Sequence, residues 1–440
     1  MRPDITWVDD FVKSISEYVY VRERDSLLIL LPNQAYKLNA TALAILKRTM
    51  QGTPIKDVLE SKSPGLASDE NVLEDVHSFF CDLRSLVMGC MGEGEGRKAV
   101  ENVPFERPHN LLPVLSEIAL TYRCNLSCKF CYAGCTCSKK TGTREMTTDQ
   151  VKRVLDTIRH EAEVPSVSWT GGEPTLRTDL VELTAHAANI GMRVNLITNA
   201  TLLTEKLVRD LRDAGLRSAQ VSLEGPDAQT HDSLTQVAGS FASTLKGLKL
   251  LHDAGLHVHT NTTVNKINAP HLCGIVELAA ELGMKRFSMN MVIPCGNAPD
   301  AEVTITYTDM AILIDRIKRK ACEQDIEFLW YSPTPYCIYN PIASRLGGKS
   351  CAACDGLLSV APTGDVLPCS SLPKSVGNLV KSSFDKVWNS RKARFWREKR
   401  YAHRICRDCS QFDLCTGACP IYWNAMGYAE LTEAGRTALV

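Results

Sequence analysis

The stretch Leu120–Tyr132 reads LTYRCNLSCKFCY and carries Cys124, Cys128 and Cys131 in the spacing Cys-x3-Cys-x2-Cys. Three closely spaced thiolates can hold three irons of a cubane iron–sulfur cluster and leave the fourth iron open to another ligand. The spacing therefore predicts such a cluster. A structural zinc site, which needs four ligands, is the alternative, with Cys135 or Cys137 as the fourth ligand. Apart from this alternative, no role is assigned to Cys135 and Cys137.

Strand and helix patterns alternate on both sides of this stretch. Six strands are predicted at 115–121, 166–170, 192–198, 218–223, 257–264 and 286–292, and helices at 147–162, 176–190, 203–214, 240–254, 271–282 and 308–323. Such alternation implies a parallel sheet with right-handed crossovers and chemistry at the carboxyl ends of the strands. We expect a partial (β/α)6 TIM-like barrel; an open doubly wound sheet is the alternative.

Further polar motifs lie where the next three predicted strands end. Gly171-Gly172-Glu173 follows the second strand, Thr198-Asn199-Ala200 the third, and Ser222-Leu-Glu224 the fourth. Two glycines allow close approach of the backbone to a ligand, and a glutamate can accept a hydrogen bond from an ammonium group. These strand ends are therefore candidate ligand contacts.

Together these motifs resemble the radical S-adenosylmethionine (SAM) superfamily. The resemblance implies that Cys124, Cys128 and Cys131 bind a [4Fe-4S] cluster whose open iron binds SAM, and that reductive cleavage of SAM gives a 5′-deoxyadenosyl radical. It also implies that the SAM-contacting residues are Gly171, Gly172, Glu173, Thr198, Asn199, Ser222 and Glu224.

Several positions depart from the family pattern. Ala200 stands where glycine is usual, Glu224 where aspartate is usual, and Thr235-Gln236 where Arg-Gly is common. We interpret His231 as a helix-capping or surface residue. Cys295, after the sixth strand, is interpreted as an inert buried thiol near the active site.

The C-terminal region carries a second set of cysteines, in the patterns Cys-x9-Gly-x4-Cys and Cys-x2-Cys-x5-Cys-x3-Cys. This resembles the SPASM extension, which binds auxiliary iron–sulfur clusters. By resemblance, the first auxiliary cluster is held by Cys354, Cys369 and Cys419 with Cys351 as the fourth ligand, and the second by Cys406, Cys409 and Cys415.

The second auxiliary cluster lacks one ligand, because no cysteine follows Cys419. An open iron, a carboxylate or Cys337 could complete it, or the cluster could be absent. Structural zinc is again the alternative. Periodicity fades after Tyr331, so we expect a loop-rich region with little apolar core that metal clusters stabilise.

Residues 14–88 resemble the PqqD-like domain that recognises leader peptides of ribosomally made peptides. Strands are predicted at 18–21 and 27–31, a helix capped by Asn39, and a second helix over 72–86. A peptide would add a strand to an exposed sheet edge; a purely structural or dimerising winged-helix-like unit is the alternative. The expected domains are 1–90, a linker at 91–110, the radical SAM core at 111–330 and the SPASM domain at 331–440.

The composition excludes several other classes of protein. The 440 residues contain 50 Lys and Arg against 50 Asp and Glu, so there is no positive surplus for nucleic acid or anionic membranes. No apolar run approaches the roughly 20 residues of a membrane span, and no secretory signal is visible. Thirteen of the eighteen cysteines lie in two clusters, and such clusters without an export signal indicate metal ligation in the cytoplasm.

We therefore expect an enzyme that modifies a ribosomally made peptide by forming a thioether or a carbon–carbon crosslink, or by decarboxylation or epimerisation. Its expected partners are the peptide and an external one-electron reductant such as flavodoxin or ferredoxin. The alternatives are haem, tetrapyrrole or other cofactor synthesis, modification of a folded protein as in sulfatase maturation, and a non-catalytic metal-stabilised binding protein.

Overall fold

The computed structural model describes residues 3–32, 34–88, 110–135, 144–298 and 303–437, which form two compact units that divide between residues 107 and 108. The predicted linker lies outside the described residues except for Asn110. Among the described helices, none is both long and apolar enough to cross a bilayer.

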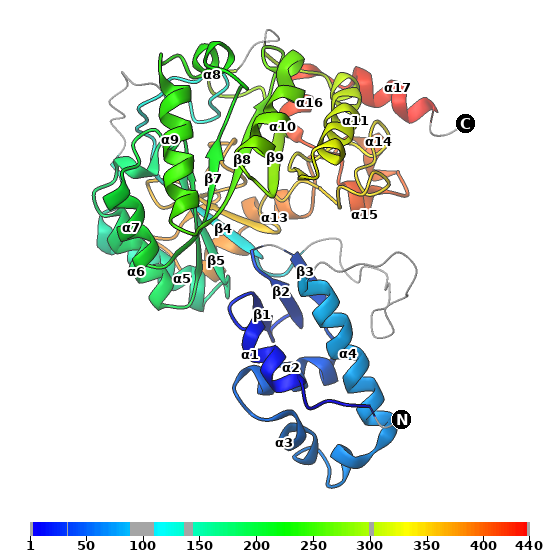
Figure 1. Cartoon of the computed structure of the whole chain (residues 1–440). Helices are drawn as coiled ribbons and strands as arrows, with labels where there is room; N and C mark the ends of the chain where they lie inside the picture. Colours follow the sequence, from blue (N-terminus) through cyan, green and yellow to red (C-terminus); the bar gives the residue numbers. More distant parts are fainter. Residues whose placement is uncertain (1–2, 33, 89–109, 136–143, 299–302, 438–440) are drawn as a thin grey trace. The chain divides into compact units, whose positions relative to one another are not determined.

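The N-terminal unit is a three-stranded antiparallel sheet with helices around it (Figure 1). Its elements are α1 (Val8–Ile15), β1 (Val19–Arg22), β2 (Leu27–Leu30), β3 (Gln34–Lys37), α2 (Ala40–Met50), α3 (Ile55–Glu60), the 3-10 turn η1 (Leu66–Ser68) and α4 (Glu70–Met88). The Asn39 side chain caps α2 as predicted, accepting a 2.8 Å hydrogen bond from the Ala42 N–H. The unit has an apolar core of its own, built around Leu46, Val58 and Phe80.

The larger unit contains the predicted parallel sheet. The six expected strands are confirmed within two residues at each end, as β4 (Leu115–Thr121), β5 (Ser166–Gly171), β6 (Arg193–Thr198), β7 (Leu216–Ser222), β8 (His257–Val264) and β9 (Arg286–Met291). The sheet is longer than predicted, because β10 (Glu327–Trp330) extends one edge and β11 (Leu357–Val360), β12 (Asp365–Leu367) and β13 (Gly377–Asn378) extend the other. The two edges do not pair, so the barrel is partial.

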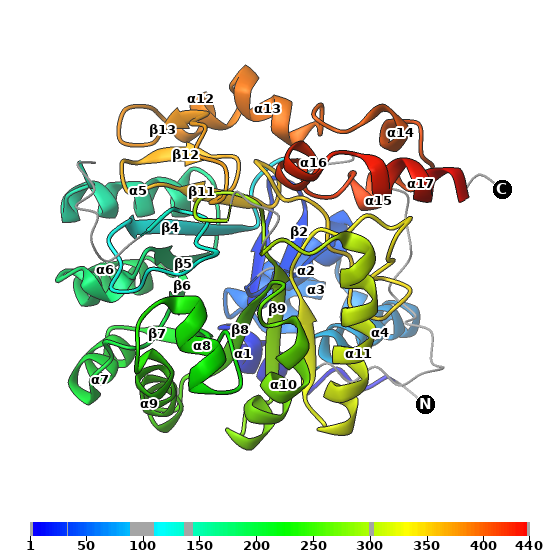
Figure 2. The same cartoon turned by 90° about the horizontal axis from the view of Figure 1, so that it is seen from above.

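Helices follow the outer side of the curved sheet (Figure 2). They are α5 (Thr148–His160), α6 (Leu180–Asn189), α7 (Glu205–Asp213), α9 (Ser240–Asp253), α10 (Leu272–Glu281) and α11 (Tyr307–Glu323), with η2 (Pro174–Leu176), α8 (Ala228–Thr235) and η3 (Ala269–His271) at the loops. Their apolar faces join those of the strands in one core that includes Trp169, Phe287 and Trp330.

The expectation of little apolar core in the C-terminal region is wrong. Its short helices are α12 (Phe384–Trp388), α13 (Arg391–Arg397), α14 (Arg404–Arg407), α15 (Phe412–Cys415), α16 (Pro420–Met426) and α17 (Ala429–Thr437). Trp388, Tyr422 and Trp423 are nearly fully buried and belong to the barrel's own apolar cluster. The region is loop-rich because its helices are short, yet its aromatic residues pack on the barrel.

Gly247 lets helix α9 approach the end of β6. A Cβ atom at this position would lie 2.1 Å from the carbonyl oxygen of Ala200. We expect Gly247→Ala to lower the free energy of unfolding by roughly 1–3 kcal/mol, because this overlap outweighs the gain in helix propensity of about 1 kcal/mol. Thermal or denaturant unfolding measures the change.

Lys246→Ala is the control, since Lys246 is an exposed residue of the same helix. It should change stability by no more than about 0.5 kcal/mol. A Gly247→Ala variant that unfolds at a higher temperature than the unmodified chain would contradict the close approach.

Candidate active site

The cluster loop leaves the end of β4 and presents Cys124, Cys128 and Cys131. Backbone N–H groups point at two of the sulfurs: Leu126 donates to the Cys124 Sγ and Cys135 to the Cys131 Sγ, both at 3.4 Å. Burial raises the pKa of Cys128, and the nearby Cys131 and Cys124 add to this rise. The three thiols therefore lie together, with donors placed to stabilise thiolates, and this donor set fits an iron–sulfur cluster.

Among the described residues, no three His, Cys, Asp or Glu side chains converge closely enough to hold one metal ion. A tetrahedral zinc ion, with Zn–S bonds of about 2.3 Å, would require the thiols to move together. Cys135 is buried beside Cys131, whereas Cys137 lies outside the described residues.

Helix α8, which the sequence analysis missed, supports the cluster loop. The carbonyl oxygens of Thr235 and Leu234 each accept a 3.0 Å hydrogen bond, from the N–H groups of Ser127 and Lys129. Thr235 acts here through its backbone, so the departure from the usual Arg-Gly does not remove this support.

His231 is not the capping or surface residue that we predicted. It lies inside α8, is only 1% exposed, and its Nδ1 accepts a 3.2 Å hydrogen bond from the Glu224 N–H. Burial lowers the pKa of His231 to about 4, so the ring is neutral near pH 7. The neighbouring Asp232 does the capping instead, because its carboxylate accepts from the Gly239 and Phe241 N–H groups at 2.7 and 2.8 Å.

Gly171, the last residue of β5, and Gly172 after it pack against the start of the cluster loop. The Gly172 N–H donates to the Thr121 carbonyl at 2.8 Å, and the Glu173 N–H donates to the Arg123 carbonyl at 2.9 Å. A Cβ on Gly171 or Gly172 would lie 2.2 Å from a backbone oxygen of that loop. The glycines therefore join two adjacent strand ends, and no larger residue fits.

The Glu173 carboxylate is fully buried and links Thr175 of η2 to Thr198 and Asn199 at the end of β6. One oxygen accepts from the Thr198 and Thr175 hydroxyls at 2.8 and 2.6 Å, and the other from the Asn199 N–H at 2.9 Å. Burial raises the pKa of Glu173, while these hydrogen bonds oppose the rise. In this structure the side chain organises the end of β6; its contact with SAM stays a prediction, as does that of Ser222 at the end of β7.

Asn199 ties β6 to the cluster loop. Its side-chain amide donates to Asn125 Oδ1 at 3.0 Å and lies 4.0 Å from the Cys124 Sγ. Ala200, where the family has glycine, adopts the left-handed backbone with φ +60°. The turn that favours glycine is thus retained with alanine, at a cost of roughly 1–2 kcal/mol.

Glu224 is buried at the end of β7, where its carboxylate accepts a 2.9 Å hydrogen bond from the Thr263 N–H. Burial raises its pKa to about 8, and its charge adds to the raised pKa of Cys128. The residue therefore lies close to the predicted cluster, although it carries one methylene more than the usual aspartate.

The segment after β9 closes the other side of the loop. The Asn297 amide donates to the carbonyls of Cys128 and Cys135 at 3.0 and 3.2 Å. Cys295 is half-buried, and electrostatic interaction links it both to Cys131 and to Cys419. It is therefore near both groups of cysteines, and it is only partly buried rather than buried as predicted.

The C-terminal cysteines fall into two groups. Around the first, Cys369 interacts electrostatically with Cys351 and Cys419, and Cys354 interacts with Cys351. Lys399, itself buried, donates to the Cys351 carbonyl at 2.6 Å and pairs with Asp355 at 2.9 Å. The second group surrounds Cys415 and includes Cys406 and Cys409. Each predicted ligand set is thus brought together.

Comparison with known proteins gives the same assignment. Residues 118–279 match the model of the radical SAM superfamily, and residues 347–410 match the SPASM iron–sulfur cluster-binding domain. The AdoMet-dependent heme synthase of Methanosarcina barkeri is 30% identical over 320 residues, which are 69% of this chain and 90% of that protein. The chain belongs to the radical SAM superfamily.

One further relative and one solved structure of similar fold extend the comparison. The PqqA peptide cyclase of Rhodopseudomonas palustris is 29% identical over 321 residues, 70% of this chain and 82% of that protein. The structure of Streptococcus suis SuiB bound to S-adenosylmethionine superposes with a TM-score of 0.69 at 18% identity, and covers 92% of this chain and 97% of SuiB. This radical SAM/SPASM enzyme therefore uses a [4Fe-4S] cluster, SAM and auxiliary iron–sulfur clusters.

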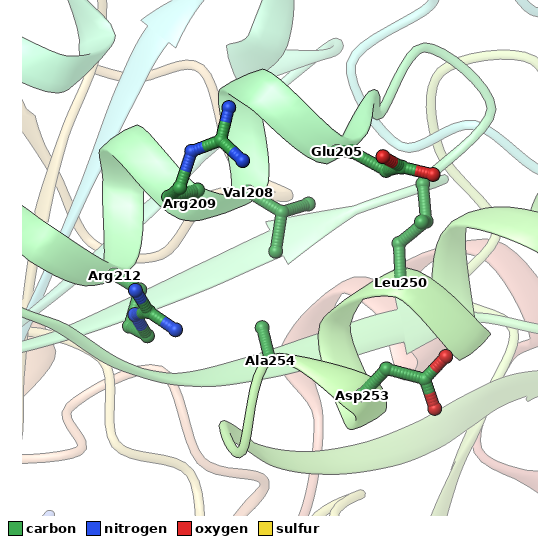
Figure 3. A pocket seen from close by; sticks show the side chains of 7 residues that line it. All are labelled: Glu205, Val208, Arg209, Arg212, Leu250, Asp253 and Ala254. Carbon is green, nitrogen blue, oxygen red and sulfur yellow. The ribbon is translucent and has the colours of Figure 1, made fainter.

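A separate hollow of about 290 Å³ lies between α7 and α9 on the outer helical layer (Figure 3). It is lined by Glu205, Val208, Arg209, Arg212, Leu250, Asp253 and Ala254. None of these residues belongs to the cluster loop or to a strand end, so this hollow is not the active site.

We expect alanine at Cys124, Cys128 and Cys131 together to abolish reductive SAM cleavage, because the open iron that binds SAM is lost. Iron should fall by about four atoms per chain while the auxiliary clusters remain. Iron analysis and detection of 5′-deoxyadenosine measure both effects in anaerobically reconstituted protein.

Cys322→Ala is the matched control, since Cys322 is an exposed cysteine of α11. It should retain the iron content and the cleavage rate of the unmodified chain. SAM cleavage that persists in the triple variant would refute the assignment of the cluster loop.

Proposed function

We propose that this enzyme modifies a ribosomally made peptide, with the N-terminal unit binding the peptide's leader. With a [4Fe-4S] cluster on Cys124, Cys128 and Cys131 and with SAM bound, one electron from an external reductant would cleave SAM to methionine and a 5′-deoxyadenosyl radical, and this radical would supply hydrogen-atom abstraction from the substrate. The observation that carries the proposal is the open sheet edge of the N-terminal unit, which is separate from the catalytic core in sequence and in its apolar packing.

Residues at the strand ends fix the geometry of the loop that is predicted to bind the cluster. The hydrogen bond from the Gly172 N–H to the Thr121 carbonyl and the hydrogen bonds accepted by the Glu173 carboxylate fix the strand ends around the cluster loop.

Strand β3 supplies an edge for strand addition. The sheet order β1-β2-β3 leaves β3 at one edge, and three of its four residues are exposed. Because the Leu38 N–H donates inward to the Ser26 carbonyl at 2.8 Å, the alternation of an antiparallel strand directs the Ala35 N–H outward. An extended peptide can pair with this edge through its backbone.

The likeness to SuiB supports the same proposal. Residues 108–440 make up about three quarters of the chain, so a match over 92% of it extends into the N-terminal unit. One SuiB structure contains its precursor peptide SuiA. The peptide cyclase relatives also act on a peptide by their name. We propose that the reaction uses an external reductant such as flavodoxin or ferredoxin, in the cytoplasm.

Tetrapyrrole synthesis is the second candidate, because AdoMet-dependent heme synthases show 27–30% identity over most of their length. The two candidates differ in what the N-terminal unit does. A peptide substrate needs the β3 edge, whereas a small tetrapyrrole bound in the core does not.

We expect Ala35→Pro in the full chain to weaken binding of the substrate peptide at least tenfold, because proline removes an outward-facing backbone donor from the edge. Candidate peptides are those encoded beside the gene, and fluorescence anisotropy measures their affinity. SAM cleavage without peptide should stay unchanged.

Ala35→Ser keeps the backbone donor and is the matched control. Equal peptide affinity in Ala35→Pro and Ala35→Ser would contradict strand addition. Turnover of iron coproporphyrin with no binding of any neighbouring peptide would favour the tetrapyrrole candidate instead.

A further inference from the structure

The second group of C-terminal cysteines has three ligands from one short stretch of chain. Cys406 lies in α14, Cys409 follows it, and Cys415 ends α15. Residues 420–440 contain no cysteine, so they do not supply the thiol that the SPASM pattern places after Cys419. A cysteine elsewhere in the described chain is therefore a candidate for the fourth ligand.

The segment that follows β10 lies against this group. The Tyr336 N–H donates to the Cys415 Sγ at 3.4 Å, and that sulfur lies 4.0 Å from the Thr334 carbonyl oxygen. The contact joins residues almost 80 positions apart in the sequence. Cys337 follows Tyr336 directly in the sequence, so its backbone lies next to the N–H group that contacts the Cys415 sulfur.

Hydrogen bonds fix the position of the segment that contains Cys337. The Trp330 indole donates to the Thr334 hydroxyl at 2.8 Å, and the Tyr307 hydroxyl donates to the Pro333 carbonyl at 3.0 Å. The Ile338 and Tyr339 N–H groups then both donate to the Pro335 carbonyl, which forms a turn around Cys337. Cys337 therefore lies in a hydrogen-bonded turn beside the second group of cysteines.

The Cys337 thiol is a near neighbour of the group. Burial raises its pKa, and the charges of Cys415 and Cys409 add to this rise. Cys337 likewise contributes to the raised pKa of Cys406. The first auxiliary group has different neighbours, since Cys369 and Cys419 each interact with Cys351.

We propose that Cys337 is the fourth protein ligand of the second auxiliary cluster and replaces the cysteine that the SPASM pattern places after Cys419. This inference rests on the SPASM assignment and not on the peptide proposal. Four thiolates leave no iron open, so this cluster carries electrons and does not bind substrate. Cys337 and Cys409 are exposed, which places one side of the cluster near the surface, where an electron partner can approach.

The experiment compares the unmodified full chain with Cys337→Ala, Cys337→Ser and the control Cys322→Ala, each reconstituted anaerobically. The unmodified chain should hold three clusters, with about twelve irons per chain. In both Cys337 variants we expect loss of one to four irons per chain and an altered electron paramagnetic resonance (EPR) spectrum of one cluster, while Cys322→Ala stays unchanged.

Unchanged iron, sulfide and EPR spectra in both Cys337 variants would overturn the proposal. So would an unmodified chain with iron for only two clusters. Because a variant can fail to fold, the unmodified protein provides a second measurement by thiol alkylation and mass spectrometry. Cys337 should be protected in the cluster-loaded chain and labelled after cluster removal, whereas the exposed Cys322 should be labelled in both; labelling of Cys337 in the loaded chain would also overturn the proposal.

Discussion

The contact between the ends of β4 and β5 is the constraint on which the site depends. Gly172 lies so close to Arg123 that a single Cβ would approach its carbonyl oxygen to 2.2 Å. Parallel strands bring their carboxyl ends to one side of the sheet, but they do not fix the loops that follow. The backbone hydrogen bonds across this contact fix the start of the cluster loop, and Glu173 then fixes the next strand end. Three thiols on a loop become one ligand set because the neighbouring loop is pinned to them.

Sequence reasoning located the elements whose pattern is local. The six strands from β4 to β9 stand out because each is an apolar run between helical patterns and turn residues. Strands β10 and β11 are only four residues long and carry no such context, so they were missed. Helix α8 was missed because its eight residues are mostly small or polar, and its inner face is buried only by tertiary packing.

The site shows the same division between local and non-local information. Cysteine spacing predicted the candidate ligands, because cluster ligands recur at fixed offsets within one loop. The prediction that His231 caps a helix or lies on the surface was wrong, because the neighbouring sequence does not show that this side of α8 is buried. The role of Glu173 was also only partly visible, because its partners Thr198 and Asn199 come from another strand. Cys337 lies almost 70 positions before Cys406, so no spacing rule could pair them.

The C-terminal region shows how a domain of short helices can fix the positions of the cysteines predicted to bind the auxiliary clusters. Its aromatic residues pack on the barrel, as Tyr307 does against Tyr422 and Trp423 with ring centroids 4.2 and 5.1 Å apart. The Tyr307 hydroxyl also accepts from the Cys419 N–H at 3.4 Å and donates to Pro333, which precedes the Cys337 turn. A single buried side chain of α11 thus touches the backbone at both auxiliary groups. Because Tyr307 belongs to the core of the barrel, the same core fixes the cluster loop and the cysteines predicted to bind the auxiliary clusters. The radical SAM site and the auxiliary groups therefore depend on one apolar core.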